Sequence, residues 1–278
     1  MHNSPMASES ELWAALGPRI INAPDDDNVR LRFAEALESS EGTERELNLI
    51  RARFIRVQLK LHTIQPDHSE WFRLSTEALS LELNHEREWT PAWFRDVGIR
   101  EAQFHRGFVE CITVSAPTLL QHQQSIFANA PIRHLDIVEL PKGKLQDMLD
   151  NLAPSKNSLG RLISLRLDGQ EIDDNDIEIL IRAPWTKLRW MSLANNEITK
   201  SGAQTLTDDH LTELQFLDLH GNPFDPTAEL NFDQGVVIEK RQQFWKEKLP
   251  SLLRFQPEVI SGQVIYPNRF QIGFRSPR

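Results

Sequence analysis

The chain has little of what stabilises exported or membrane-spanning proteins. Its 278 residues include one cysteine, Cys111, so no disulfide can form within the chain. No stretch approaches the roughly eighteen uninterrupted apolar residues of a membrane span, and MHNSPMASESELW at the start has no signal-peptide pattern. We therefore expect a soluble cytoplasmic protein in a reducing compartment with no membrane partner, while export by a route that needs no signal stays open.

Positive charge is also scarce. The formal net charge is -9, and clustered Lys and Arg are what nucleic-acid binding needs, so we expect no nucleic-acid partner. Residues 1–105 and 131–226 each carry about -6, and the tail 227–278 carries about +3. The basic residues of the tail fit the solvated face of a helix over Glu239–Leu249, and the acidic remainder suits a basic partner.

Recognisable catalytic motifs are absent. The sequence has no G-x-x-x-x-G-K-S/T, G-x-G-x-x-G, H-E-x-x-H, C-x-x-C pair or G-x-S-x-G. Cys111 falls in an apolar strand pattern, which favours a buried, inert thiol over a nucleophile. We therefore expect no enzyme, no cofactor and no metal site. An enzyme with an unrecognised site near Tyr266, Asn268 and Arg269 stays open as an alternative.

What the sequence does contain is a repeat. Three similar segments begin at Leu162, Leu188 and Leu214, in two steps of 26 residues. They are LISLRLDGQEID, LRWMSLANNEIT and LQFLDLHGNPFD. A fixed period of this length predicts a solenoid, and L-x-x-L-x-L-x-x-N is the leucine-rich-repeat pattern. Asn196 and Asn222 hold the asparagine position, where an amide can satisfy backbone groups of neighbouring turns, and Gln170 replaces it in the earlier copy.

Two upstream segments extend the repeat. IRHLDIVEL from Ile132 fits with Leu140 in the asparagine position, and GFVECITV from Gly107 has the alternation of a first strand. The text between the strands has apolar residues three or four apart, which predicts helices. These segments are TLLQHQQSIFANA, GKLQDMLDNLA, DDNDIEILIRA and TKSGAQTLTDDHL. We expect an α/β leucine-rich-repeat solenoid with a concave parallel sheet and convex helices, and ITKSGAQTL resembles repeats of the ribonuclease-inhibitor class.

Helices are predicted from Glu11 to Leu61, where apolar residues recur with helical spacing. Asp25–Asp27 lie between the first two. A calcium loop would need a following glycine and glutamate at fixed spacing, which are missing, so these aspartates are interpreted as a turn and helix cap.

This N-terminal sequence resembles the short repeat-companion domain of bacterial proteins, which often lies next to leucine-rich repeats. The matching segments are PDDDNVRLRFAEALES, ARFIRVQLKL, EREWTPAW and FHRGFVE, with an enlarged acidic turn SSEGTERE. The resemblance implies a bacterial protein with an interaction role, and it supplies no catalytic residues. Together with the repeats it covers about Glu11 to Asp225.

Four regions follow from these patterns. We expect a disordered N-terminus over 1–10, a companion domain with bridging helices over 11–105, the solenoid over 106–226 and a C-terminal cap over 227–278. The cap should contain a helix at FWKEKLPSLLRF and a hairpin around Pro267–Asn268. The tryptophans of residues 66–105 are interpreted as packing rather than as a ligand cage.

The alternation of a strand places the residues between the inward leucines on the concave face. Three rows result, and all their members except Ser164, Val138 and Ala194 are the predicted partner-binding residues. His134, Ser164, Trp190 and Phe216 form the first row; Asp136, Arg166, Ser192 and Asp218 the second; Val138, Asp168, Ala194 and His220 the third. His134, Asp136 and His220 cannot share a metal, since two strands separate the last from the others by roughly 14 Å.

Trp190 and Phe216 are predicted to lie side by side outside the core. One interpretation is that the C-terminal segment or a loop covers them; the other is that they anchor a partner, ringed by Asp136, Asp168 and Asp218. We expect a non-catalytic module, monomeric when free, that binds a basic protein, with an inhibitor or immunity protein against a bacterial toxin effector as the specific version. A regulatory scaffold with several partners is the alternative.

Overall fold

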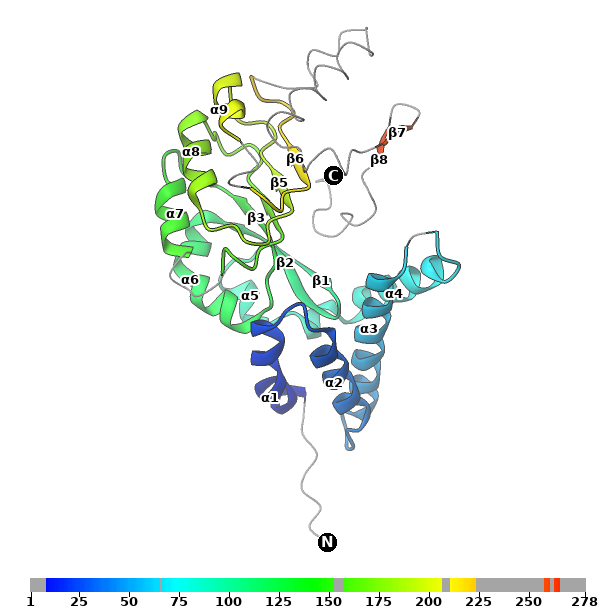
Figure 1. The fold of residues 1–278 in the computed structure, drawn as a ribbon. Helices are drawn as coiled ribbons and strands as arrows, with labels where there is room; N and C mark the ends of the chain where they lie inside the picture. Colours follow the sequence, from blue (N-terminus) through cyan, green and yellow to red (C-terminus); the bar gives the residue numbers. More distant parts are fainter. Residues whose placement is uncertain are drawn as a thin grey trace. The chain divides into compact units, whose positions relative to one another are not determined.

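The structure is a computed structural model that describes residues 9–65, 67–152, 158–206 and 211–223 and two short strands near the C-terminus. Over these residues the chain is a mixed α/β structure with a six-stranded sheet in the order β1-β2-β3-β4-β5-β6 (Figure 1). The strands are β1 (Glu101–His105), β2 (Phe108–Ser115), β3 (His134–Val138), β4 (Ser164–Arg166), β5 (Trp190–Ser192) and β6 (Phe216–Asp218). The predicted α/β class and a mainly parallel sheet are confirmed.

The chain divides into two compact units. Unit 1 comprises Met1–Val97, Ala102–Cys111 and Gln124–Ile132, and unit 2 comprises Gly98–Glu101, Ile112–Gln123 and Arg133–Arg278. β2 therefore begins in unit 1 and ends in unit 2.

Unit 1 begins with amphipathic helices, as the spacing of apolar residues predicts. They are α1 (Glu9–Asn22), α2 (Asp27–Glu38), α3 (Arg45–Thr63), α4 (Trp71–Trp89) and the short α5 (Ala92–Asp96). α1 begins two residues inside the expected disordered N-terminus. The core between α1, α2 and α3 includes Ile20, Phe33, Leu37 and Ile55, all fully buried, with Phe108 packed against them.

The aspartate run before α2 is a helix cap. Asp26 is the N-cap residue, and its side chain accepts a hydrogen bond of 3.0 Å from the backbone N–H of Asn28. Asp27 lies in the first turn, where a carboxylate interacts favourably with the helix dipole. The interpretation of Asp25–Asp27 as a turn and cap is confirmed.

The end of the predicted helical region is a strand instead. We expected helices over 66–105, but β1 occupies the last five residues and reaches β2 through Arg106 and Gly107. Both turn residues have positive φ, 50° and 87°, which is the type I′ geometry of a two-residue antiparallel hairpin. A Cβ on Gly107 would also lie 2.9 Å from the Cα of Ile55, so this turn requires glycine. The alternation in AQFH was too short to show a strand.

In unit 2 the copies of the repeat align as the 26-residue step predicts. β4 pairs with β5 through Leu165↔Met191, and β5 pairs with β6 through Met191↔Leu217, both in parallel. β3 pairs in the same way with β4 through Leu135↔Leu165. Leu135, Leu165 and Met191 are buried. The inward positions of these three strands are thus identified correctly, and Leu217 on β6 is half-buried.

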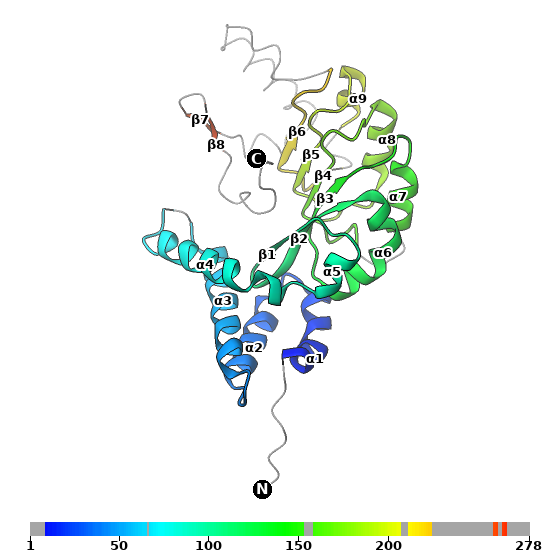
Figure 2. The same cartoon turned by 180° about the vertical axis from the view of Figure 1, so that it is seen from behind.

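Helices alternate with these strands. They are α6 (Ala116–Asn129), α7 (Leu145–Leu152), α8 (Asp174–Arg182) and α9 (Lys200–Thr205). Figures 1 and 2 show α7, α8 and α9 side by side along one face of β3–β6. Asp173 caps α8 and Thr199 caps α9, and the Ser115 hydroxyl accepts from the backbone N–H of Thr118 in the first turn of α6. α9 is shorter than predicted, and residues 207–210 lie outside the described ones.

After each strand of the repeat, the chain passes through one residue in the left-handed conformation. Glu139, Gly169, Asn195 and Gly221 have φ of 54°, 65°, 56° and 72°. The next residue is the asparagine position of the pattern. Asn196 Oδ1 accepts from the backbone N–H groups of Gln170 (2.8 Å) and Ile172 (3.1 Å), and its Nδ2 donates to the carbonyl of Leu167.

Asn222 repeats this pattern one strand further on, accepting from Ile198 N–H at 3.0 Å and donating to the Leu193 carbonyl at 2.8 Å. The position therefore joins each turn to the preceding one, as the repeat pattern predicts.

The C-terminal part is described only at β7 (Glu258–Ile260) and β8 (Gln263–Ile265), which pair antiparallel. The predicted helix at FWKEKLPSLLRF and the predicted turn at Pro267–Asn268 lie outside the described residues.

Candidate functional site

The first predicted row contains an aromatic pair. Trp190 and Phe216 are register partners on β5 and β6, and their rings stack with centroids 5.0 Å apart at an interplanar angle of 24°. Both side chains are half-buried. Their neighbour Met191 is buried, so by strand alternation the two rings point to the other face of the sheet. The structure thus places them together, as the sequence predicts.

The two residues at the other end of that row are buried. His134 and Ser164 are also register partners, but both are buried, and His134 Nδ1 lies 2.9 Å from Ser164 Oγ. We included His134 among the partner-binding residues. Its 7% exposure removes it from the accessible face, because neighbouring side chains cover it. His134 lies in the predicted row, but its expected accessibility is wrong. The same correction applies to Asp136 and Ser192, which are 8% and 4% exposed.

The centre of the face is a network around Asp168. Its carboxylate accepts from Arg166 Nε at 2.5 Å, from Ser192 Oγ at 2.6 Å and from the backbone N–H of Ala194 at 3.0 Å. Ser192 is buried, while Arg166 and Asp168 are half-buried. These contacts hold the Arg166 guanidinium in one place on the face.

Asp136 lies on the other side of Arg166. It accepts from Thr113 Oγ1 at 3.2 Å, and Arg166 Nη1 is 3.8 Å from its carboxylate. Burial raises the pKa of Asp136, and the charge of Arg166 and the bond from Thr113 only partly oppose this rise. Burial lowers the pKa of Arg166, but Asp168 and Asp136 outweigh it and leave the pKa raised. Arg166 therefore stays charged between two carboxylates.

The last strand carries the most accessible charges of the set. Asp218 accepts from the backbone N–H of His220 at 3.0 Å and lies 2.7 Å from its Nδ1. The His220 side chain is 53% exposed. The strand order keeps β4 and β5 between His220 and the pair His134 and Asp136, so these three residues form no joint site, as expected.

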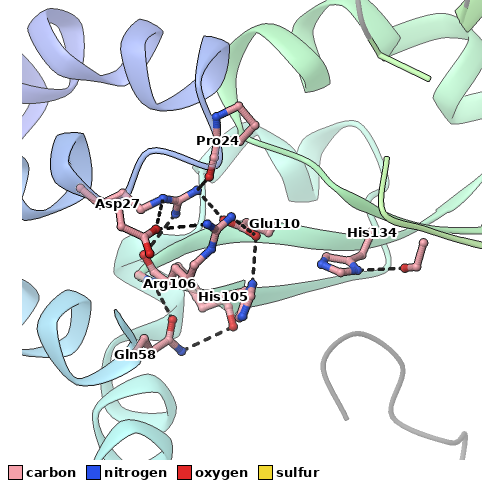
Figure 3. Close-up of polar contacts among 11 residues, drawn as sticks. Pro24, Asp27, Gln58, His105, Arg106, Glu110 and His134 are labelled. Atoms are coloured by element: carbon pink, nitrogen blue, oxygen red, sulfur yellow. Dashed lines mark hydrogen bonds and ion pairs between the residues drawn. The ribbon is translucent and has the colours of Figure 1, made fainter. Parts of the chain in front are cut away.

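Unit 1 contains a second polar cluster that the sequence did not suggest as a group. Arg30, Arg106 and Glu110 have side chains at most 2% exposed. Arg30 Nη2 lies 2.5 Å from Glu110 Oε1, and Arg106 Nη2 lies 2.8 Å from the same oxygen (Figure 3). Burial alone would raise the pKa of Glu110, but Arg30, His105 and Arg106 lower it far below its ordinary range.

The cluster extends to the surrounding elements. Arg106 donates to Asp27 at 3.1 Å, and Arg30 donates to the carbonyls of Pro24 and Arg106, each at 3.1 Å. His105 Nδ1 lies 3.0 Å from Glu110 Oε2. Figure 3 shows these groups converging from α2 and the β1–β2 hairpin. They fasten the hairpin to α2. The sequence signal was two arginines and a glutamate inside the apolar patterns VRLRF and FHRGFVE.

The tryptophan-rich part of unit 1 is packed, as we expected. Trp89 stacks on Phe54 with centroids 4.6 Å apart, and the buried guanidinium of Arg51 lies 4.7 Å from the Trp89 ring. Phe104 lies 5.6 Å from the same guanidinium. Burial lowers the pKa of Arg51 to about 10, against the opposing charge of Glu9. The Trp89 and Phe104 rings thus pack against a side chain of the chain itself.

Comparison of the chain with protein-family models, with curated proteins and with solved structures finds no match. Among the described residues, no helix combines the length and apolar character needed to cross a membrane. Cys111 is a buried free thiol, as predicted.

Proposed function

We propose that unit 2 is a leucine-rich-repeat solenoid of the ribonuclease-inhibitor-like class, attached to a companion domain, and that it is a non-catalytic module for binding another protein. The 26-residue step of the register and the amide bonds of Asn196 and Asn222 support the repeat class. The exposed strand face is the proposed binding surface.

The observation that carries this proposal is the stacked pair of Trp190 and Phe216. Two half-buried rings in contact form a rigid apolar centre, and aromatic residues surrounded by polar groups are the usual composition of a binding hot spot. Asp168 and Arg166 form the polar surround, already held by their bond to each other and by the bond from the buried Ser192. A preformed surface loses little entropy on binding.

The charge of the face favours a basic partner. Asp168 and Asp218 outnumber Arg166 among the half-buried charges of this face, and the whole chain carries -9. Electrostatic attraction would speed encounter with a basic protein and would weaken at high salt. An immunity protein or inhibitor that blocks a basic toxin effector suits these properties. A scaffold with several partners is the second version of the same binding function.

Affinity capture from the native cell tests the proposal. Wild-type chain, Trp190→Ala and a control, Leu47→Ala, are used as baits; Leu47 is an exposed leucine on α3, outside the strand face. We expect one stoichiometric basic partner that Trp190→Ala loses and Leu47→Ala keeps, with a loss in affinity of about 30-fold or more. The thermal stability of Trp190→Ala should stay near that of wild type.

Three results would decide against parts of this proposal. If no partner is captured, the alternative of an enzyme with an unrecognised site is favoured. If many partners are captured, the scaffold is favoured. Unfolding of Trp190→Ala would assign Trp190 to the core. For the inhibitor version, co-expression with the captured partner must relieve its toxicity, and failure to do so removes that version.

A further inference from the structure

The described helices expose one apolar stripe. Phe72, Leu79 and Leu83 of α4 are 77%, 46% and 65% exposed. Their spacing of seven and four residues places them on one side of the helix, within roughly 40° of one another. Leu74 and Ala78 of the same helix are buried against Val57 of α3. α4 therefore has two apolar faces, and α3 covers one of them (Figures 1 and 2).

This stripe has the spacing of a short coiled-coil seam. Phe72, Thr76, Leu79, Leu83 and Glu86 follow one another in alternating steps of four and three residues. A solitary exposed leucine needs no explanation, but three large apolar side chains on one helical face mark an interaction surface.

The flanks of the stripe carry opposite charges. Arg87 lies along one flank together with Arg73, whose guanidinium is paired with Glu70 and Glu77, and Glu82 lies along the other. Two such helices in parallel place the acidic flank of each beside the basic flank of the other, with Glu82 opposite Arg87 five residues further on. An antiparallel pair instead sets like flank against like flank. The charge pattern therefore favours a parallel pair of identical helices.

We propose that α4 pairs in parallel with α4 of a second copy of this chain, through the stripe Phe72, Leu79 and Leu83. The pairing uses unit 1 alone and does not depend on the strand face of unit 2. Two stripes of this length bury less than the roughly 1,200 Å² of a standard interface, so the dimer is weak and depends on concentration. It departs from the sequence-based expectation of a monomer.

Sedimentation equilibrium of the full chain tests the pairing. We expect the average mass to rise from 32.1 kDa toward twice that value between about 1 and 300 µM. Leu83→Glu should remain at the monomer mass, because a charge replaces one of the three apolar side chains of the stripe. Leu47→Glu is the matched control, since Leu47 is 49% exposed but belongs to α3, and it should dimerise as wild type does.

Two further variants test the orientation. In Glu86→Cys, a parallel pair brings the two new thiols within disulfide reach, whereas an antiparallel pair separates them by about 20 Å along the helix axes. The native Cys111 is buried and does not compete. Glu82→Arg should weaken the dimer about tenfold, and the double variant Glu82→Arg with Arg87→Glu should restore it.

The outcomes are distinct. Cross-linking of Glu86→Cys together with loss of the dimer in Leu83→Glu supports the proposal. A wild-type chain that stays monomeric throughout the concentration range overturns it, as does a dimer that Leu83→Glu leaves intact. A dimer without cross-linking in Glu86→Cys overturns the parallel pairing.

Discussion

The side-chain carbonyl of Gln170 accepts the backbone N–H of Leu140 at 2.8 Å, one strand before Asn196 accepts the N–H of Gln170 at the same distance. Gln170 stands where the repeat pattern has asparagine, and its longer side chain still reaches the preceding turn. Its Nε2 donates to the Asp168 carbonyl rather than to a group of the neighbouring strand. With glutamine in place of asparagine, the side-chain amide at this position still accepts a bond from the preceding turn, but it no longer donates one to the neighbouring strand.

The first prediction concerns this amide position. Asn196→Ala removes the acceptor for the part-buried N–H of Gln170 and the buried N–H of Ile172. We expect a loss of about 3 kcal/mol in the free energy of unfolding, measured by urea denaturation. Asn151→Ala on the exposed side of α7 should change it by less than about 0.5 kcal/mol. Equal effects of the two variants would mean that the amide bonds contribute little.

The second prediction concerns the hairpin turn of unit 1. Gly107→Ala must accommodate both φ of 87° and a Cβ only 2.9 Å from the Ile55 backbone. Gly42→Ala meets a similar conformation, φ of 105°, with nothing within 4 Å of the new Cβ. We expect Gly42→Ala to cost about 1 kcal/mol of conformational strain and Gly107→Ala about 2 kcal/mol more. Thermal denaturation compares them, and similar melting temperatures would contradict the close packing at Gly107.

The third prediction concerns the buried cluster around Glu110. Glu110→Gln leaves Arg30 and Arg106 without their shared carboxylate, and we expect a loss of about 3–5 kcal/mol at pH 7. Glu77→Gln, in the more exposed pair with Arg53, should cost less than about 1 kcal/mol. Urea denaturation of both variants makes the comparison.

The same residue gives a dependence on pH. Because the pKa of Glu110 is lowered in the folded state, its contribution is complete above the unfolded value of about 4.5 and is lost as the pH falls from there toward the folded value. Wild type should therefore lose stability below about pH 4.5 more steeply than Glu110→Gln does. Parallel curves for the two proteins between pH 5 and pH 2 would contradict a lowered pKa.

The parts predicted best are those where one local rule is enough. The 26-residue step at Leu162, Leu188 and Leu214 predicted the register of β4, β5 and β6, because identical turns stack with identical residues side by side. The stacking of Trp190 on Phe216 follows from that register. Asp26 was predicted as a cap because a carboxylate before a helix satisfies amides within its own turn.

The parts that the sequence did not predict depend on contacts between distant segments. β1 has only five residues, and its pairing with β2 depends on a turn whose glycine packs on Ile55, far away in the chain. The cluster joins Arg30 to Glu110 across 80 positions, and no local pattern announces such a pair. The exposure of His134 likewise depends on side chains around it, since an alternating pattern assigns a face and not its accessibility.

The sequence by itself determined the α/β class, the repeat and its register, and the row in which Trp190 and Phe216 meet, because periodic burial and strand alternation are local properties of the chain. Tertiary structure alone decided that Arg30 and Arg106 share the buried carboxylate of Glu110, that His134 is covered, and that α4 is left with an uncovered apolar stripe. Burial of charge and exposure of apolar surface depend on which distant elements come to lie beside a residue, and that is settled only when the elements pack.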